Sequence, residues 1–451
     1  MSKVEKPHFV IVGGGLGGAL MANYLGRAGF ETDVYEMRGD IRKHGAAGGR
    51  SINLALSHRG ICALQRVGLA DDVMKTAVAM PGRMIHGLDS SPVFQPYGTR
   101  RDQAIHSVSR GGLNALLLEA AEHYPTVRLH FERKCTDVDL DSGEVKLLDT
   151  ATGDSTTVHG DIVVSADGAF SAVRSPMQKL DRFDYRQDYL AHGYKELTIP
   201  PGENGSFRLE KHALHIWPRR SFMMIALPNE DGSYTCTLFW PFAGPVSFDA
   251  VSTKEQLLQV FETYYPDAVG HMPTLVEDYF ENPVGSLATI RCGPWYYRDR
   301  VVLLGDAAHA VVPFYGQGMN ASFEDVLVLD ECMQRHKPDW QRAFEAYYEA
   351  RKKDVDALAD LAIGNFVEMR DHTGSRRFLL RKKKERILHR LFPKWYIPLY
   401  TMATFTRMSY VAAVARARKQ DTIVFWVAIA IFVILFGVVW TVLSSIARGS
   451  L

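Results

Sequence analysis

The sequence predicts an α/β protein in which a Rossmann-type domain carries an inserted antiparallel β-sheet domain. A helical C-terminal region and one apolar terminal helix are expected to follow. Three observations lead to this prediction: a glycine-rich βαβ unit near the N-terminus, alternating apolar segments in the middle of the chain, and a long uncharged stretch near the C-terminus. A length of 451 residues leaves room for two or three such domains.

The N-terminal unit begins with an apolar run, Phe9–Val12, that is typical of a buried strand. Gly13, Gly15 and Gly18 follow it in G-x-G-x-x-G spacing and open a helix, after which a second short strand is expected. The glycines allow a tight turn and a close approach to a pyrophosphate, whose charge the helix N-terminus attracts. Glu36 lies where a carboxylate can accept hydrogen bonds from ribose hydroxyls. The unit predicts a dinucleotide site and leaves FAD and NAD(P) as alternatives.

Two later strands also end in acidic turns. The first is followed by Asp167-Gly168, and the second by Gly305-Asp306. Ligands of open α/β sheets bind at the carboxyl ends of the strands, so Asp167 is expected at that edge and Asp306 is a candidate acceptor for cofactor hydroxyls. The turn before the helix that starts at Ala321 has backbone amides that can face a flavin carbonyl. An Asp-Gly turn on its own would not indicate a ligand site.

Two further segments have open alternatives. Ser109 is a candidate N-cap for a helix over Leu113–His123, and Arg110 beside it is either a ligand of a cofactor phosphate or a surface residue. The basic, glycine-rich stretch Arg38–Arg50 is either a surface loop or a segment lying along the cofactor. Its composition alone favours the surface loop.

The middle of the chain, Leu180–Leu287, alternates apolar and polar residues between turns rich in Pro, Gly and Asn. This pattern predicts an antiparallel sheet. The predicted division of the whole chain is residues 1–75, 102–178 and 288–335 for the dinucleotide domain, 76–101 and 179–287 for the sheet domain, 336–420 for the helical region and 421–445 for a terminal anchor.

The C-terminal stretch Ile423–Leu443 contains no charged residue. As a helix it would be about 31 Å long, close to the hydrocarbon thickness of a bilayer. Basic residues gather before it and only Arg448 follows, which places the N-terminal part on the cytoplasmic side. The alternative is a buried core helix. The basic run Arg376–Arg390 is either a solvated helix face or a surface against anionic lipid headgroups.

Composition excludes some classes of function. A net charge of +1 gives no reason to expect nucleic acid as a partner. Five scattered cysteines without a C-x-x-C pair are typical of reduced thiols and predict no zinc site.

The three turns stand in an order that resembles the single-component FAD-dependent aromatic hydroxylases. The resemblance implies a bound FAD, NADPH as co-substrate, and contacts of Asp167 with both and of Asp306 with the FAD ribityl chain. The cofactor-binding residues expected on this basis are Gly13, Gly15, Gly18, Glu36, Arg38, Leu54, Ala55, Arg110, Asp167, Asp306, Gly318, Met319 and Asn320.

Within that class, the chain resembles the kynurenine 3-monooxygenase family over essentially its whole length. The resemblance rests on Gly48–Ser57, Pro313–Asn320, Gly364–Asp371 and the apolar tail. One departure is Tyr315, where Phe or His is expected, and it bears on packing or substrate orientation. The substrate-binding residues that the resemblance implies are Arg83 and Tyr97 at the amino-acid carboxylate, with Asn365, Glu368, Tyr400 and Phe314. By itself, Arg83 would be read as a surface residue.

The implied activity is hydroxylation of L-kynurenine to 3-hydroxy-L-kynurenine with NADPH and O2, by oxygen transfer from a flavin C4a-hydroperoxide. No residue is assigned as a catalytic acid or base. The alternatives are a hydroxylase of another aromatic acid and a membrane-tethered flavoprotein without hydroxylase activity. The tail does not show which membrane it enters: a eukaryotic source would suggest the mitochondrial outer membrane, and a bacterial source the inner membrane. NADPH contacts and oligomeric state are not indicated.

Overall fold

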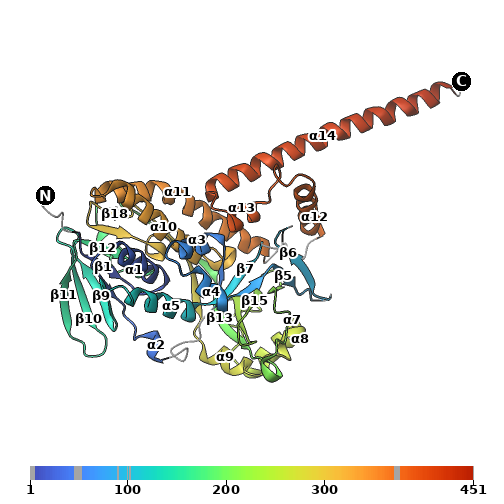
Figure 1. Cartoon of the computed structure of the whole chain (residues 1–451). Coiled ribbons are helices and arrows are strands. Elements are labelled where there is room, and N and C mark those ends of the chain that lie inside the picture. Colours follow the sequence, from blue (N-terminus) through green and yellow to red (C-terminus); the bar gives the residue numbers. More distant parts are fainter. Residues whose placement is uncertain are drawn as a thin grey trace.

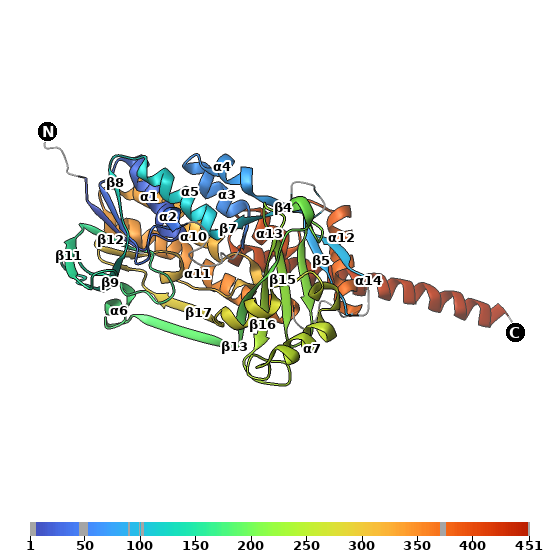
Figure 2. The ribbon, with the colours of Figure 1, turned by 90° about the horizontal axis from the view of Figure 1, so that it is seen from below.

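A computed structural model of the chain describes residues 6–44, 53–88, 91–98, 100, 103–369 and 376–449. Figure 1 shows a mixed α/β body from which one long C-terminal helix projects. The two ends of the chain lie at opposite ends of the molecule in both views (Figures 1 and 2).

A six-stranded sheet forms the centre of the first half of the body, in the order β18-β19-β12-β1-β2-β8. The strands are parallel except for β18 at one edge. Their apolar runs are buried on both faces, as in parallel sheets covered by helices. The strands are β1 (Phe9–Val12), β2 (Thr32–Tyr35), β8 (Val127–His130), β12 (Ile162–Ser165), β18 (Tyr296–Tyr297) and β19 (Val301–Leu303). The predicted N-terminal βαβ unit is confirmed.

Helices cover this sheet and share its hydrophobic core. They are α1 (Leu16–Ala28), α3 (His58–Arg66), α5 (Arg110–Glu122), α10 (Gly318–His336) and α11 (Trp340–Val367). The Ser109 hydroxyl accepts a hydrogen bond from the Gly112 amide at 3.2 Å, so the predicted N-cap of α5 is confirmed.

A seven-stranded sheet forms the second half of the body, in the order β17-β13-β16-β15-β14-β5-β6. It is antiparallel, as predicted, except that β14 and β5 pair in parallel with Leu214 beside Arg83. The long strand β13 extends toward the first sheet (Figure 2). The strands are β5 (Gly82–Ile85), β6 (Val93–Pro96), β13 (Asp184–Ile199), β14 (Leu214–Pro218), β15 (Met223–Pro228), β16 (Tyr234–Pro241) and β17 (Gly285–Gly293).

Part of the segment predicted as sheet is helical instead. The segment holds α7 (Lys254–Tyr264), α8 (Pro266–Val269) and α9 (Leu275–Glu281). Thr253 and Gln256 form a capping box at the start of α7, and Leu257 and Phe261 are buried one turn apart. The sheet prediction is wrong for this part, because the capping box and the buried residues at helical spacing favour helix over strand locally.

Two small sheets and several short helices complete the body. One sheet orders β11 (Ser155–His159), β10 (Glu144–Asp149) and β9 (Arg133–Val138), and the other orders β3 (Asn53–Leu56), β7 (Ile105–Ser109) and β4 (Val78–Met80). The short helices are α2 (Ile41–His44), α4 (Ala70–Thr76), α6 (Arg174–Met177) and the 3-10 turns Glu203–Gly205, Gly305–Ala307 and Pro313–Tyr315.

The C-terminal region consists of α12 (Arg376–Leu391), α13 (Leu399–Phe405) and α14 (Tyr410–Gly449). The first turns of α14 pack against the body, where Tyr410 and Ala413 are fully buried. Within the described residues one stretch, Tyr410–Ser445, is long and apolar enough to cross a membrane, and no residue of its most apolar part is buried.

Candidate active site

The carboxyl ends of the central strands bring the predicted turns together. Gly13 follows β1 with φ of 101°, a conformation that favours glycine. A Cβ atom at Gly13 would lie 2.4 Å from the carbonyl oxygen of Ala166, directly before the Asp167 turn. The first glycine therefore lets the β1 turn pack against the end of β12.

The remaining glycines shape the start of α1. A Cβ atom at Gly18 would collide with the Gly13 carbonyl oxygen at 1.9 Å, so the helix and the turn touch there. At Gly15 no described atom lies within 4 Å of such a Cβ, and the helix start is open on that side. The Glu36 carboxylate accepts hydrogen bonds from the Gly14 amide at 2.9 Å and the Arg38 amide at 3.0 Å. Glu36 thus lies beside the glycine turn, as a ribose ligand would require.

The two acidic turns differ in what their side chains do. Asp167 accepts hydrogen bonds from the Ser165 hydroxyl at 2.6 Å and the Ala172 amide at 2.7 Å. Much of the hydrogen-bonding capacity of its carboxylate is therefore used to stabilise its own turn. The Asp306 side chain has an exposed surface. Many protein atoms nevertheless lie around its carboxyl group, and the desolvation that they cause raises its pKa. His309 and Arg110 are near enough to oppose this rise. An exposed carboxylate enclosed in this way suits a hydrogen-bonding ligand.

Asn320 connects strand β3 to the first turn of α10. Its amide nitrogen donates to the carbonyl oxygens of Ala55 at 2.8 Å and Gly316 at 3.0 Å, and its oxygen accepts from the Ser57 amide at 2.8 Å. Asn320 is fully buried. Its side chain therefore holds Leu54 and Ala55 beside the N-terminus of α10, where Gly318 and Met319 present their backbone amides.

A second cluster joins three separated parts of the chain. The Arg83 guanidinium, on β5, lies 5.8 Å from the ring centre of Tyr97 and 6.0 Å from that of Tyr400 on α13. The two tyrosine rings stack at 5.1 Å. The buried Nε of Arg83 has no hydrogen-bond partner among the described residues. An unpaired guanidinium N–H beside two phenols fits a carboxylate ligand.

This cluster borders a small cavity of about 60 Å³. Glu385, Arg386 and His389 of α12 form another part of its wall. The sequence did not indicate these residues as site residues. Their spacing of three to four places them on one helix face, but the sequence alone does not show what that face covers.

The 3-10 turn Pro313–Tyr315 lies next to the cluster. The Phe314 ring packs between Phe239 at 4.8 Å and Phe366 at 4.2 Å, which gives an apolar, aromatic wall. The Tyr315 ring lies 5.6 Å from the Tyr400 ring, and burial raises the pKa of Tyr315. Tyr315 is thus part of the packing around Tyr400, and the residue that departs from the expected Phe or His is at the site.

The end of α11 contacts the same turn. The Asn365 amide donates to the carbonyl oxygen of Phe314 at 2.5 Å. Glu368, one turn later, pairs with Arg381 of α12 at 2.7 Å. Both residues lie near the cluster, although these contacts are to protein groups. Residues 45–52 and 370–375, which hold parts of two resemblance motifs, are outside the described residues.

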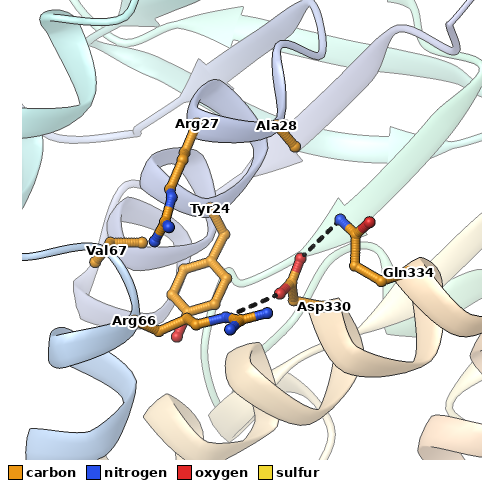
Figure 3. Close-up of a pocket in the computed structure, with 7 residues that line it drawn as sticks. All are labelled: Tyr24, Arg27, Ala28, Arg66, Val67, Asp330 and Gln334. Carbon is orange, nitrogen blue, oxygen red and sulfur yellow. Dashed lines mark hydrogen bonds and ion pairs between the residues drawn. The ribbon is translucent and has the colours of Figure 1, made fainter.

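A larger cavity of about 240 Å³ lies elsewhere, between α1, α3 and α10. Figure 3 shows Tyr24, Arg27, Arg66 and Asp330 around it. It adjoins the C-terminal end of α1, whereas the glycine turn is at the N-terminal end of that helix. This cavity is therefore separate from the candidate dinucleotide site.

Comparison with known proteins defines the class. A family model described as an FAD binding domain matches residues 7–242 and 249–358. Solved structures share the fold: 2-methyl-3-hydroxypyridine-5-carboxylic acid oxygenase has a TM-score of 0.67 at 20% identity, covering 84% of this chain and 96% of its own. A p-nitrophenol 4-monooxygenase of Pseudomonas putida has a TM-score of 0.65 at 18% identity, covering 85% and 94%. The chain has the fold of the FAD-binding aromatic hydroxylases.

Relatives at higher identity define the family more narrowly. A kynurenine 3-monooxygenase of Myxococcus xanthus is 46% identical over 94% of this chain and 91% of its own length. Those of Dictyostelium discoideum and Sus scrofa are 48% and 44% identical, over 91% and 94% of this chain and 90% and 89% of their own lengths. The chain belongs to the kynurenine 3-monooxygenase family.

Proposed function

We propose that the protein hydroxylates L-kynurenine to 3-hydroxy-L-kynurenine, using bound FAD, NADPH and O2. The observation that carries the proposal is the Arg83 cluster, where a guanidinium with an unpaired buried N–H lies beside Tyr97 and Tyr400. Such a cluster recognises a carboxylate, and the aromatic wall around Phe314 fits the ring of the same substrate. Family membership favours kynurenine over other aromatic acids.

The residues present fit an FAD. The open helix start at Gly15 leaves room for a pyrophosphate, Glu36 lies beside it for the ribose, and the enclosed Asp306 is available to the ribityl chain. The amides of Gly318 and Met319 at the start of α10, held against β3 by Asn320, would face the flavin ring. We assign Arg38, Leu54, Ala55, Arg110, Asp167, Gly13 and Gly18 to the same site. When bound, FAD would supply the oxygen activation, with NADPH as the source of electrons.

The protein's own part is binding, orientation and exclusion of water. Arg83 and Tyr97 would fix the substrate carboxylate, while Asn365, Glu368 and Tyr400 would surround the amino-acid end. The Pro313–Tyr315 turn connects this end of the site to the start of α10. Holding a ring at reacting distance from the cofactor is a large part of catalysis in such enzymes.

We further infer that α14 spans a membrane as a tail anchor, with the body on the cytoplasmic side. No residue of its most apolar part is buried, and Arg416, Arg418 and Lys419 precede it. The membrane would be the mitochondrial outer membrane in a eukaryote and the inner membrane in a bacterium. We retain the predicted division into an FAD domain, a sheet domain with the substrate residues, a helical region and the anchor.

The test of the activity is NADPH oxidation by the detergent-solubilised full chain, with and without L-kynurenine, followed by mass analysis of the product. Strong stimulation and a product heavier by one oxygen atom are expected. Stimulation that yields only hydrogen peroxide would indicate a hydroxylase of another aromatic acid. If no aromatic amino acid stimulated oxidation, the hydroxylase proposal would be abandoned in favour of a tethered flavoprotein.

A further inference from the structure

Helix α12 has one face toward the substrate cavity. Glu385, Arg386 and His389 line the cavity that also contains Arg83 and Tyr97. His389 is buried and its Nδ1 lies 2.7 Å from the carbonyl oxygen of Tyr396, so this side of the helix is firmly packed.

The other face of α12 exposes apolar side chains. Leu380, Ile387 and Leu391 have 65%, 48% and 64% of their surfaces exposed. They recur at intervals of seven and four residues and therefore lie along one side of the helix. A helix that only covered the cavity would have polar residues there. Three aligned apolar side chains that are exposed to solvent indicate a surface that binds a protein partner or a membrane.

Cations accompany these apolar residues. Lys383, Lys384 and Arg390 belong to the same side of α12 and are exposed. In the part of the chain that the structure describes, no carboxylate lies within ion-pair distance of any of the three. Apolar side chains among unpaired lysines and arginines are typical of helices that lie in the interface of an anionic bilayer.

The segment that follows α12 is held beside the start of the apolar part of α14. The Gln420 side chain exchanges two hydrogen bonds with the backbone of Ile397, at 2.9 and 3.2 Å, and the Tyr396 hydroxyl donates to Asp421 at 3.2 Å. Trp395 directly precedes this bonded segment and therefore lies near the start of the apolar part of α14. It is 42% exposed. Tryptophan favours the headgroup region of a bilayer. Figure 1 shows α12 beside the part of α14 that leaves the body.

We propose that α12 binds an anionic membrane surface through its outer face, formed by Leu380, Lys383, Lys384, Ile387, Arg390 and Leu391. The inference rests on the proposed membrane span of α14, because that span brings α12 to the lipid. The occupant is the headgroup layer of acidic phospholipids, whose charge complements the three cations. Since the inner face of the same helix is a wall of the cavity, the substrate site would lie directly behind the membrane interface.

The test uses the full chain in nanodiscs of phosphatidylcholine, with or without phosphatidylglycerol. The measured quantity is amide hydrogen exchange across residues 376–395. We expect slower exchange in the anionic discs, and added salt should remove the difference. In the double variant Lys383→Gln/Lys384→Gln, the difference in exchange rate between anionic and neutral discs should shrink by about fivefold for each lysine lost.

The matched control is Lys134→Gln/Lys179→Gln, which removes the same charge from exposed lysines near β9, far from α14 (Figure 2). This variant should keep the full lipid difference. Equal exchange of wild-type α12 in both lipids, or an equal loss in both variants, would overturn the proposal. The fraction of protein retained in the discs tests the membrane span separately, and neither readout depends on hydroxylation.

Discussion

Arg83 is the residue whose surroundings are most specific for a ligand. It is half-buried, its Nε has no partner among the described residues, and it faces two stacked tyrosines. In Arg83→Ala a charge-assisted contact to the substrate carboxylate would be lost. We expect L-kynurenine binding to weaken by about 2–4 kcal/mol, measured by titrating the flavin absorbance.

The control for this prediction is a change in the ligand. The amine that remains when L-kynurenine loses its carboxylate should bind wild type and Arg83→Ala with similar affinity. If Arg83→Ala weakened both ligands equally, the residue would act on the fold of the site and not on the carboxylate. Unchanged affinity for L-kynurenine would place the carboxylate elsewhere.

Asp306 is the residue on which we expect FAD retention to depend. In Asp306→Ala the proposed contact with the ribityl chain is lost. The loss of one hydrogen bond to a charged group should raise the dissociation constant of FAD about tenfold. More flavin should therefore separate from the protein on gel filtration. The control is Asp299→Ala, which removes an exposed carboxylate close to Asp306 in the sequence. This variant should retain FAD. Full retention by Asp306→Ala would remove this residue from the cofactor site.

Asp330, in the larger cavity, should make stability depend on pH. It is 7% exposed, its closest cation is Arg66 at 3.9 Å, and desolvation raises its pKa. A carboxyl with a raised pKa in the folded state binds its proton more tightly than in the unfolded chain. Folding is therefore favoured at acidic pH and loses stability as pH rises through the folded-state pKa.

Asp330→Asn removes that ionisation. We expect thermal unfolding at neutral pH to shift upward by an amount equivalent to about 1 kcal/mol, with the gain vanishing near pH 4. Asp360→Asn, which is exposed and pairs with Arg291 at the surface, is the comparison and should not gain stability. A destabilised Asp330→Asn at neutral pH would mean that the ion pair with Arg66 outweighs desolvation.

At the scale of elements, local pattern decided what could be predicted from sequence. The turn from Gly13 to Glu36 was predictable because strand, glycines, helix and acid lie within one short segment. The α7 helix carried its own signal in Thr253 and Leu257, and the prediction still missed it. The meeting of Arg83, Tyr97 and Tyr400 has no local signal, since three distant segments must fold first. Only the family resemblance predicted it, and the wall formed by α12 was not predicted.

A buried ion cluster joins four of these elements. The Arg59 guanidinium on α3 contacts both carboxylate oxygens of Glu324 on α10, at 2.8 and 2.6 Å, and Arg351 on α11 donates to the same carboxylate at 2.8 Å. Arg59 also donates to the carbonyl oxygens of Ala403, in α13, and of Met408, in the connection between α13 and α14. All three charged residues are at most 3% exposed. The cluster thus fixes the helical C-terminal region to the body.

Glu324→Gln should therefore be strongly destabilising. Two buried guanidinium groups would lose their shared counter-charge, and we expect a loss of about 3–5 kcal/mol in unfolding free energy, measured by denaturant titration. Glu331→Gln is the matched control on the same helix, because the ion pair that Glu331 makes among the described residues is with the half-exposed Arg407 at 3.7 Å. It should change stability by less than about 1 kcal/mol. Equal effects would show that the buried cluster adds nothing specific.

At the scale of the whole molecule, α14 belongs to two environments. Its beginning is part of the body: Tyr410 is fully buried beneath the Arg59 guanidinium at 4.0 Å, and the Val411 amide donates to Asp354 at 3.1 Å. Gln420 and Asp421 still bond to the 396–397 segment. Ile423 and Val424 are half-buried, and from Phe425 to Thr441 the helix is exposed and predominantly apolar. The boundary between body and anchor lies at the end of these contacts, inside one continuous helix.

Two truncations should separate these environments. A chain ending at Thr422 keeps the buried residues and hydrogen bonds of α14 between Tyr410 and Asp421 and loses the apolar part, so it should partition into the soluble fraction and retain FAD and a cooperative unfolding transition. A chain ending at Arg407 exposes the buried surface around Arg59 and Asp354, since Tyr410 and Ala413 are gone. Removing a buried aromatic residue alone costs about 3–5 kcal/mol, so this shorter chain should unfold at a much lower temperature or aggregate. Both are compared with the full chain in detergent by flavin content and thermal unfolding. If the Thr422 chain lost its flavin or its cooperativity, the exposed part of the helix would have to support the fold as well as the attachment to lipid.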